Sequence, residues 1–139
     1  MPGVVPMCLA MLMCRGVTRD ARTGEPVINR SFEFFEAEFF PMQSEPFAVW
    51  MQLRNGNGVT PLALTVEYVP SARLEPEVVV AVKFTLHFED PNAVLEHEAA
   101  FDNGLHFQQS GRYRLRLATG GAAIVQRDFR VFRSQEARG

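Results

Sequence analysis

An alternation of apolar and polar residues near the C-terminal end of the chain is the feature that most constrains its fold. Within residues 112–117, Tyr and Leu occupy every second position, and Arg occupies the positions between them. Gly120-Gly121 then provides a turn, and a second apolar run ends in Phe129 and Val131. Because successive side chains of a strand point to opposite faces, this pattern predicts two antiparallel strands joined by a tight hairpin.

The same period of two recurs upstream, and helical periodicity is nearly absent. In residues 77–89 the even-numbered positions are apolar, and the odd-numbered positions become polar toward the end. Residues 47–53 and 62–68 alternate likewise, with Asn-Gly-Asn-Gly at 55–58 between them. Since Asn-Gly is a strong turn signal, we expect these two runs to form a hairpin.

The N-terminal third contains shorter extended segments. Residues 6–18 predict a first strand, and a turn at residues 23–24 precedes a short return at 27–28. A further strand is expected at residues 32–35. The chain therefore continues to alternate between strands and turns at short intervals.

Two irregularities are expected within this pattern. In the last strand, Ile124 is an even-numbered and Phe129 an odd-numbered position, so a regular strand would point them to opposite faces. A β-bulge at residues 126–128 would allow both side chains to point inward. The spacing of apolar residues over 91–98 allows a short helix.

These segments together predict an all-β fold. The expected architecture is a two-sheet antiparallel β-sandwich, immunoglobulin-like, with about eight or nine short strands. At 139 residues the chain is long enough to bury one core. We expect a single domain over residues 1–133, followed by a flexible polar tail over 134–139.

Charge and cysteine usage limit the functional classes. A net charge of -2 gives no general attraction to nucleic acid or anionic lipid, and no run reaches the roughly 18 apolar residues of a membrane helix. Cys8 and Cys14 share one face of the predicted first strand, about 20 Å apart and beyond disulfide reach. The apolar N-terminus lacks a basic region and is interrupted by Pro2 and Pro6, so no cleaved signal is expected. The sequence therefore predicts a reduced, cytoplasmic protein.

Turn and strand motifs spread over nearly the whole chain match a known pattern. The matching segments are 14–20, 23–25, Phe32, 39–41, 47–53, 111–115, Gly121 and 129–131. This combination resembles DUF6941, a bacterial family of unknown function. Because the motifs are turns, alternating strands and a Gly-x-Tyr corner, the resemblance implies a β-sandwich and transfers no catalytic residue.

The sequence shows no signature of catalysis or metal binding. No serine lies in a Gly-x-Ser-x-Gly motif, and both cysteines lie in an apolar run that would raise a thiol pKa. His87 and His97 have carboxylates nearby, but adjacent strand residues point to opposite faces and no metal-ligand spacing occurs. We expect no metal, no cofactor and no enzymatic activity.

Arginines are concentrated in the last two predicted strands. The candidates for an anion-binding face are Arg112, Arg114, Arg116 and Arg130. Such a face would bind a phosphate, a nucleic-acid backbone or an acidic partner. The interpretation we favour is that these arginines, with Arg127 and Arg133, pair with acids of neighbouring strands, and Glu33, Glu36 and Glu38 are candidates. Nucleic acid is not expected, because no aromatic side chains are interleaved with the arginines.

Aromatic residues are more numerous than one sheet face can bury. Trp50, Phe35 and Phe132 fall opposite their apolar neighbours in the predicted strands, so they are either exposed or covered by loops. Exposed aromatic residues are typical of surfaces where partners dock. The residues we expect at such an interface are Phe35, Trp50, Phe132, Met7 and Met11.

The leading functional hypothesis is a non-catalytic protein-interaction or assembly module. It would bind itself or a larger partner through an exposed aromatic and apolar surface. The alternatives are a carbohydrate- or other ligand-binding module that uses Trp50 and Tyr68, and an anion-binding module that uses the arginine face. The sequence leaves open whether the apolar N-terminus is a core strand, a swapped strand or a docking segment.

Overall fold

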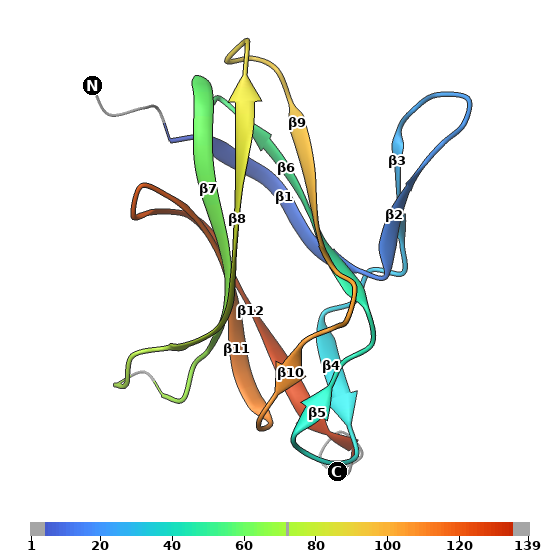
Figure 1. The fold of residues 1–139 in the computed structure, drawn as a ribbon, viewed down its shortest axis with the longest axis vertical. Helices are drawn as coiled ribbons and strands as arrows, with labels where there is room; N and C mark the ends of the chain where they lie inside the picture. The colour runs from blue at the N-terminus through green and yellow to red at the C-terminus, as the bar shows by residue number, and fades with distance from the viewer. Residues whose placement is uncertain (1–4, 72, 135–139) are drawn as a thin grey trace.

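Twelve β-strands form the regular elements of the residues that this computed structural model describes, which are 5–71 and 73–134 (Figure 1). They are β1 (Met7–Cys14), β2 (Gly16–Arg19), β3 (Pro26–Asn29), β4 (Phe34–Ala37), β5 (Met42–Gln43), β6 (Phe47–Arg54), β7 (Gly58–Tyr68), β8 (Glu77–Phe88), β9 (Leu95–Phe101), β10 (His106–Phe107), β11 (Gly111–Thr119) and β12 (Ala122–Arg133). The prediction of an all-β chain is confirmed, whereas the expected eight or nine strands are too few. Apart from Ser134, the predicted tail lies outside the described residues.

Two main sheets hold most of the chain. The small sheet has the order β1-β6-β9, and the large sheet has the order β4-β12-β11-β7-β8. β2 pairs with β3, and β5 pairs with β10, in separate two-stranded sheets. Paired strands are antiparallel except β4 and β12, which are parallel, so the expectation of wholly antiparallel sheets is wrong at this edge. The β2–β3 hairpin projects to one side of the main sheets (Figure 1).

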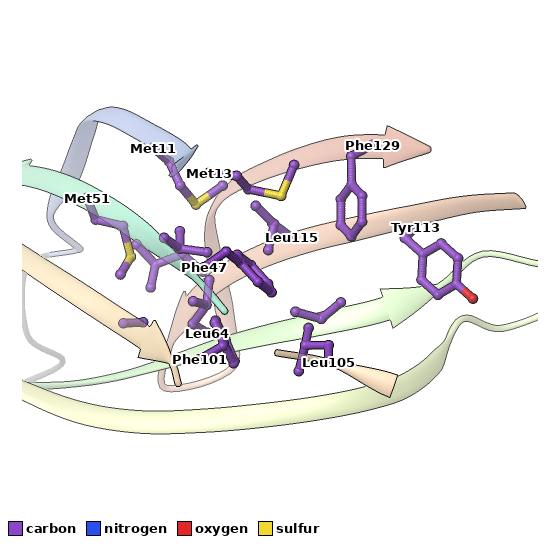
Figure 2. Close-up of a cluster of buried hydrophobic side chains, with 14 of the residues drawn as sticks. Met11, Met13, Phe47, Met51, Leu64, Phe101, Leu105, Tyr113, Leu115 and Phe129 are labelled. Carbon is purple, nitrogen blue, oxygen red and sulfur yellow. The ribbon is translucent and has the colours of Figure 1, made fainter. Parts of the chain in front are cut away.

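The two main sheets share one hydrophobic core (Figure 2). Tyr113 and Leu115 of β11 are almost fully buried, as the alternation predicts. Met11 and Met13 of β1, together with Met51 of β6, lie in the same cluster (Figure 2). Full burial of a side chain of this size stabilises the folded state by about 1.5–3 kcal/mol.

Residues 55–58 do not close a hairpin. β6 belongs to the small sheet and β7 to the large sheet, so this connection crosses between sheets. The Asn55 N–H donates to the Pro91 carbonyl at 3.0 Å, and Gly56 packs so tightly against the Phe88 ring that a Cβ would clash. Asn-Gly predicts a turn correctly, but the turn type does not say which sheet the chain enters next.

The bulge in the last strand lies at Ile124, not at residues 126–128. Leu117 pairs with Val125 and Ala118 pairs with Ala123, so Ile124 is the extra residue. The shift places Arg127 on the inner face of the large sheet, opposite Leu115.

Two further bulges change which side chains share a face. In β1 the register shifts at Leu9, so Cys8 lies on the inner face and Cys14 on the outer face, contrary to expectation. In β8 the shift at Val79 turns Val78 outward, where its exposed fraction is 61%. A bulge inserts one unpaired residue, which moves every residue beyond it to the other face.

Two predicted segments have a different structure. Residues 91–98 do not form a helix: a turn at Pro91 leads into β9, which pairs with β6. The predicted first strand, 6–18, is divided at Arg15, whose N–H donates to the Asn29 carbonyl at 2.8 Å. The chain there leaves the small sheet and enters the β2–β3 hairpin.

Arg127 ties the large sheet to the free edge of the small sheet. Its guanidinium donates to the Met11 carbonyl at 2.7 Å and contacts the Glu33 carboxylate at 3.1 Å. β1 pairs with β6 on one side only, and the Phe32 N–H satisfies the Met13 carbonyl two residues further along. The C-terminal half of this edge therefore has its carbonyl groups satisfied by other segments.

His97 of β9 stacks on Phe84 of β8, with ring centroids 3.9 Å apart and ring planes 3° apart. The contact closes one side of the core between the two sheets. Burial lowers the pKa of His97 below its ordinary value of 6.5, while the Glu98 carboxylate acts weakly in the opposite direction. The neutral imidazole is therefore the form that this packing accommodates.

We expect Arg127→Met to lower the free energy of unfolding by about 2 kcal/mol, because it leaves the Met11 carbonyl without its charged donor. Glu33→Gln should lower it by no more than about 0.5 kcal/mol, since that exposed pair is screened by water. Urea denaturation measures both values. Equal losses for the two variants would contradict the assignment of the Met11 contact as the stabilising one.

We expect stability to fall as the pH drops below about 6.5. The folded-state pKa of His97 is depressed, so between that value and 6.5 the unfolded chain binds more protons. Stability is then present above this range and lost as the pH falls through it. Thermal unfolding between pH 7.5 and 5 should show a shallower slope for His97→Gln than for the exposed control His106→Gln; equal slopes would exclude this role.

Candidate functional site

Phe35 is part of the core and is not available to a partner. Its exposed fraction is 5%, and its ring centroid lies 5.1 Å from those of Phe47 and Phe107. The prediction that Phe35 faces outward is wrong. It assumed that Phe32 and Phe35 lie in one regular strand, whereas Phe32 precedes β4 and its orientation does not determine that of Phe35. Parallel pairing with β12 places Phe35 beside inward-facing Val131, and Phe34 outward.

Trp50 faces outward from the small sheet, as its parity indicates, but it is covered. The β2–β3 hairpin packs over it with Val17 and Ile28, which leaves an exposed fraction of 8%. Arg19 of the hairpin pairs with Glu96 of β9 at 2.7 Å and holds the hairpin against the sheet. The expectation of an exposed Trp50 is therefore wrong. Its Nε1–H is buried with no hydrogen-bond acceptor among the described residues.

The two methionine candidates are separated by the bulge in β1. Met11 is in the core at 5% exposure, and Met7 is 53% exposed. Leu9 at the bulge and Val5 before the strand are exposed as well. Within residues 5–14 the apolar N-terminus is thus an edge strand of the small sheet, and of the two candidates only Met7 is accessible.

Phe132 joins two aromatic residues that the sequence interpretation did not select. Phe132 is half-buried and meets Phe34 edge to face, with ring centroids 5.7 Å apart. Phe34 is 51% exposed, and Phe39 is 78% exposed. We call Phe34, Phe39 and Phe132 the aromatic surface. The high density of Phe in residues 32–40 could have indicated this surface. The sequence interpretation, however, assigned Phe34 to the inner face and Phe35 to the outer face, which is the reverse of the structure.

Two hollows meet at the aromatic surface. Phe34 and Phe39 line one of about 680 Å3, together with Glu36 and Glu38. Phe34 and Phe132 line the other, of about 320 Å3. Among the described residues, neither Glu36 nor Glu38 takes part in an ion pair. The first hollow therefore combines apolar walls with two carboxylates that make no ion pair among the described residues. Arg15 and Glu45 line it as well and pair with each other at 3.8 Å.

The four arginine candidates do share the outer face of the large sheet. Arg112 pairs across the strands with Arg130, and Arg114 pairs with Asp128. The Asp128 carboxylate contacts Arg114 at 2.9 Å and Arg112 at 3.4 Å, which neutralises the centre of the group. Arg130 lies over the Phe132 ring, 5.5 Å from its centroid. This arrangement favours a pairing role over an anion site.

The bulge in β12 and the assignment of β6 and β7 to different sheets decide two further expectations, one about Arg127 and one about Trp50 with Tyr68. Arg127 does not belong to the arginine face, but its expected pairing with an acidic residue is confirmed, since it contacts the Glu33 carboxylate at 3.1 Å on the other side of the sheet. Trp50 and Tyr68 do not form a sugar-stacking platform, because Trp50 lies on the outer face of the small sheet and Tyr68 is associated with the core.

Metal-ligating side chains do not gather at one point in residues 5–71 and 73–134. Within them, no group of three His, Cys, Asp or Glu side chains is placed to hold a metal ion. Cys8 and Cys14 are free, and burial raises the pKa of each thiol. A protonated, shielded thiol is a poor nucleophile. No helix in the described part of the chain has the length and apolar character to cross a membrane.

Comparison with solved structures finds distant likenesses to β-glucosidases. A Trichoderma reesei β-D-glucoside glucohydrolase aligns at 9% identity and a TM-score of 0.48, over 91% of this chain and 19% of that enzyme. The Listeria innocua β-glucosidase aligns at 12% identity and a TM-score of 0.46, over 85% and 19%. This chain thus spans about a fifth of the length of those enzymes, and likeness at this level carries no information about its function.

Comparison with protein families gives a direct assignment. No curated protein matches the chain at a significant level. The model of one family matches residues 9–132, from within β1 to within β12, and the family is described as one of unknown function. The chain therefore belongs to the DUF6941 family.

Proposed function

We propose that this chain is a non-catalytic protein-interaction module that binds a partner protein through the aromatic surface. The observation that carries the proposal is the exposure of Phe34, which contacts half-buried Phe132, and of Phe39, which lines the same hollow as Phe34. Large exposed aromatic side chains that lie together are typical of surfaces where partners dock.

The energetic argument rests on the area that these rings leave in water. A buried aromatic side chain removes about 150–250 Å2 from solvent, and each Å2 of apolar area contributes roughly 25 cal/mol. Covering Phe34 and Phe39 would therefore stabilise a complex by several kcal/mol before the costs of association. Neither ring contributes to the core of the monomer.

The charges around the aromatic surface indicate the chemistry of the partner. Glu36 and Glu38 line the same hollow as Phe39 and make no ion pair among the described residues. Arg130 lies over Phe132, so this negative charge belongs to the Phe39 side of the surface, where a complementary segment would present an apolar side chain flanked by Lys or Arg. Charged groups at the rim of an interface steer association and select partners more than they add affinity.

We infer further that the two main sheets form an immunoglobulin-like β-sandwich. The support is the core shared by their inner faces and the crossing of the chain between sheets after β6 and after β8. The Tyr113 hydroxyl also donates to the Gln109 carbonyl, four residues upstream, at 2.6 Å. Such a tyrosine corner is a hallmark of that architecture.

The test is photo-crosslinking in the organism that encodes the chain. A benzoylphenylalanine residue in place of Phe39 should give a discrete adduct with one protein. The same residue in place of Val59, which is 69% exposed on β7, should not give that adduct. Phe34→Ser should lower the yield of the adduct about tenfold, because a central aromatic residue supplies much of the binding energy.

Two controls make the result specific. Phe34→Ser should lower the free energy of unfolding by no more than about 1.5 kcal/mol, since it removes one edge-to-face contact with Phe132 from a half-exposed position. Glu36→Lys combined with Glu38→Lys should also reduce the yield. The proposal is wrong if positions 39 and 59 give the same adducts, or if Phe34→Ser leaves the yield unchanged.

A further inference from the structure

β8 leaves one complete backbone edge unpaired. It is the last strand of the large sheet and pairs with β7 alone, over residues 77–88. No backbone hydrogen bond from its other side occurs among the described residues. At about 3.3 Å per residue, twelve residues present an edge of roughly 40 Å.

The other three edges of the main sheets are short or protected. β4 has four residues. β9 carries the outward carboxylates of Glu96 and Glu98, and its neighbour Arg19 pairs with Glu96. On β1, Arg127 and the Phe32 N–H satisfy carbonyl groups of the C-terminal half of the edge, and the bulge at Leu9 interrupts the other half. Charged side chains, short strands and covering segments are the ordinary protections of a sheet edge.

β8 has an apolar composition, and its only protections of this kind among the described residues are the bulge at Val79 and Lys83. Its sequence is EVVVAVKFTLHF, in which Lys83 is the one charged residue between Glu77 and His87. Of the residues that face the core, Val80, Val82 and Phe84 are only half-buried. A neighbouring strand would satisfy the backbone edge and cover these side chains together.

We propose that β8 pairs antiparallel with β8 of a second copy of this chain, which joins two large sheets into one. An unpaired strand edge of this length is complementary to another strand, and an antiparallel pair related by a two-fold axis uses the same surface twice. The surface is distinct from the aromatic surface, so either proposal can fail without the other.

The side chains favour the register with Val82 on the two-fold axis. It avoids the alternative register of equal overlap, with Lys83 on the axis, in which the two Lys83 side chains would lie opposite each other. On the inner face it places Val80 opposite Phe84 of the second copy, so half-buried apolar groups meet. On the outer face it places Lys83 opposite exposed Ala81, so the two Lys83 side chains do not face each other.

The test is the solution mass of the purified chain, by light scattering behind a sizing column over a roughly hundredfold concentration range. The expected result is a rise from one chain to two. Ala81→Lys sets like charges opposite each other at two symmetric positions and should raise the dimer Kd roughly tenfold. Ala81→Glu should lower the Kd. Combining Ala81→Lys with Lys83→Glu should restore dimerisation.

Ala100→Lys is the matched control, since Ala100 is exposed on the outer face of the small sheet. It should leave the dimer Kd unchanged. The emission of Trp50, the single tryptophan, confirms that each variant is folded, because the indole is buried. A monomer at every concentration overturns the proposal. A dimer that responds equally to Ala81→Lys and Ala100→Lys, or that Ala81→Glu weakens, overturns it as well.

Discussion

The unequal width of the two main sheets is the constraint on which the rest of this structure depends. Three strands of the small sheet and five of the large sheet supply one core. Side chains at the centre, such as Leu64 and Leu115, are fully excluded from water, while those of β8 at the margin are not. The small sheet does not cover the whole inner face of the large sheet. At one end β5, β10 and the loop that carries Leu105 cover the core instead.

The same difference in width explains why a few polar contacts fix segments at the edges of the core, where apolar packing is incomplete. Arg127 reaches from β12 to the carbonyl of Met11 because β1 has no further strand on that side. The Ser44 hydroxyl accepts the Leu105 N–H at 2.9 Å, and the Ser44 N–H donates to the Leu105 carbonyl at 2.8 Å, which secures that loop. Gly104 allows this approach, because a Cβ there would meet the Ser44 backbone. Each of these contacts fixes a segment that covers the edge of the core.

Most of the fold could be predicted from the alternation in the sequence, since residues such as Tyr113 and Leu115 report burial directly. The errors arise where a single inserted residue reverses parity. Ile124, Leu9 and Val79 are bulge residues with no local sequence signal that distinguishes them from their neighbours. Phe35 was misplaced because the start of β4 depends on its pairing with β12, a contact about a hundred residues distant in the chain. The site depends on the same parity and was therefore predicted less well than the fold.

The β2–β3 hairpin is structurally an insertion between two strands of the main sheets. Its backbone pairs only with itself, so neither main sheet loses a ladder of hydrogen bonds if the insertion varies in length. Its main contacts with the rest of the chain are the packing of Val17 and Ile28 over Trp50 and the ion pair between Arg19 and Glu96. The residue at position 50 and the presence of the hairpin should therefore change together during evolution: a relative without the insertion would carry a smaller or polar side chain in place of this tryptophan.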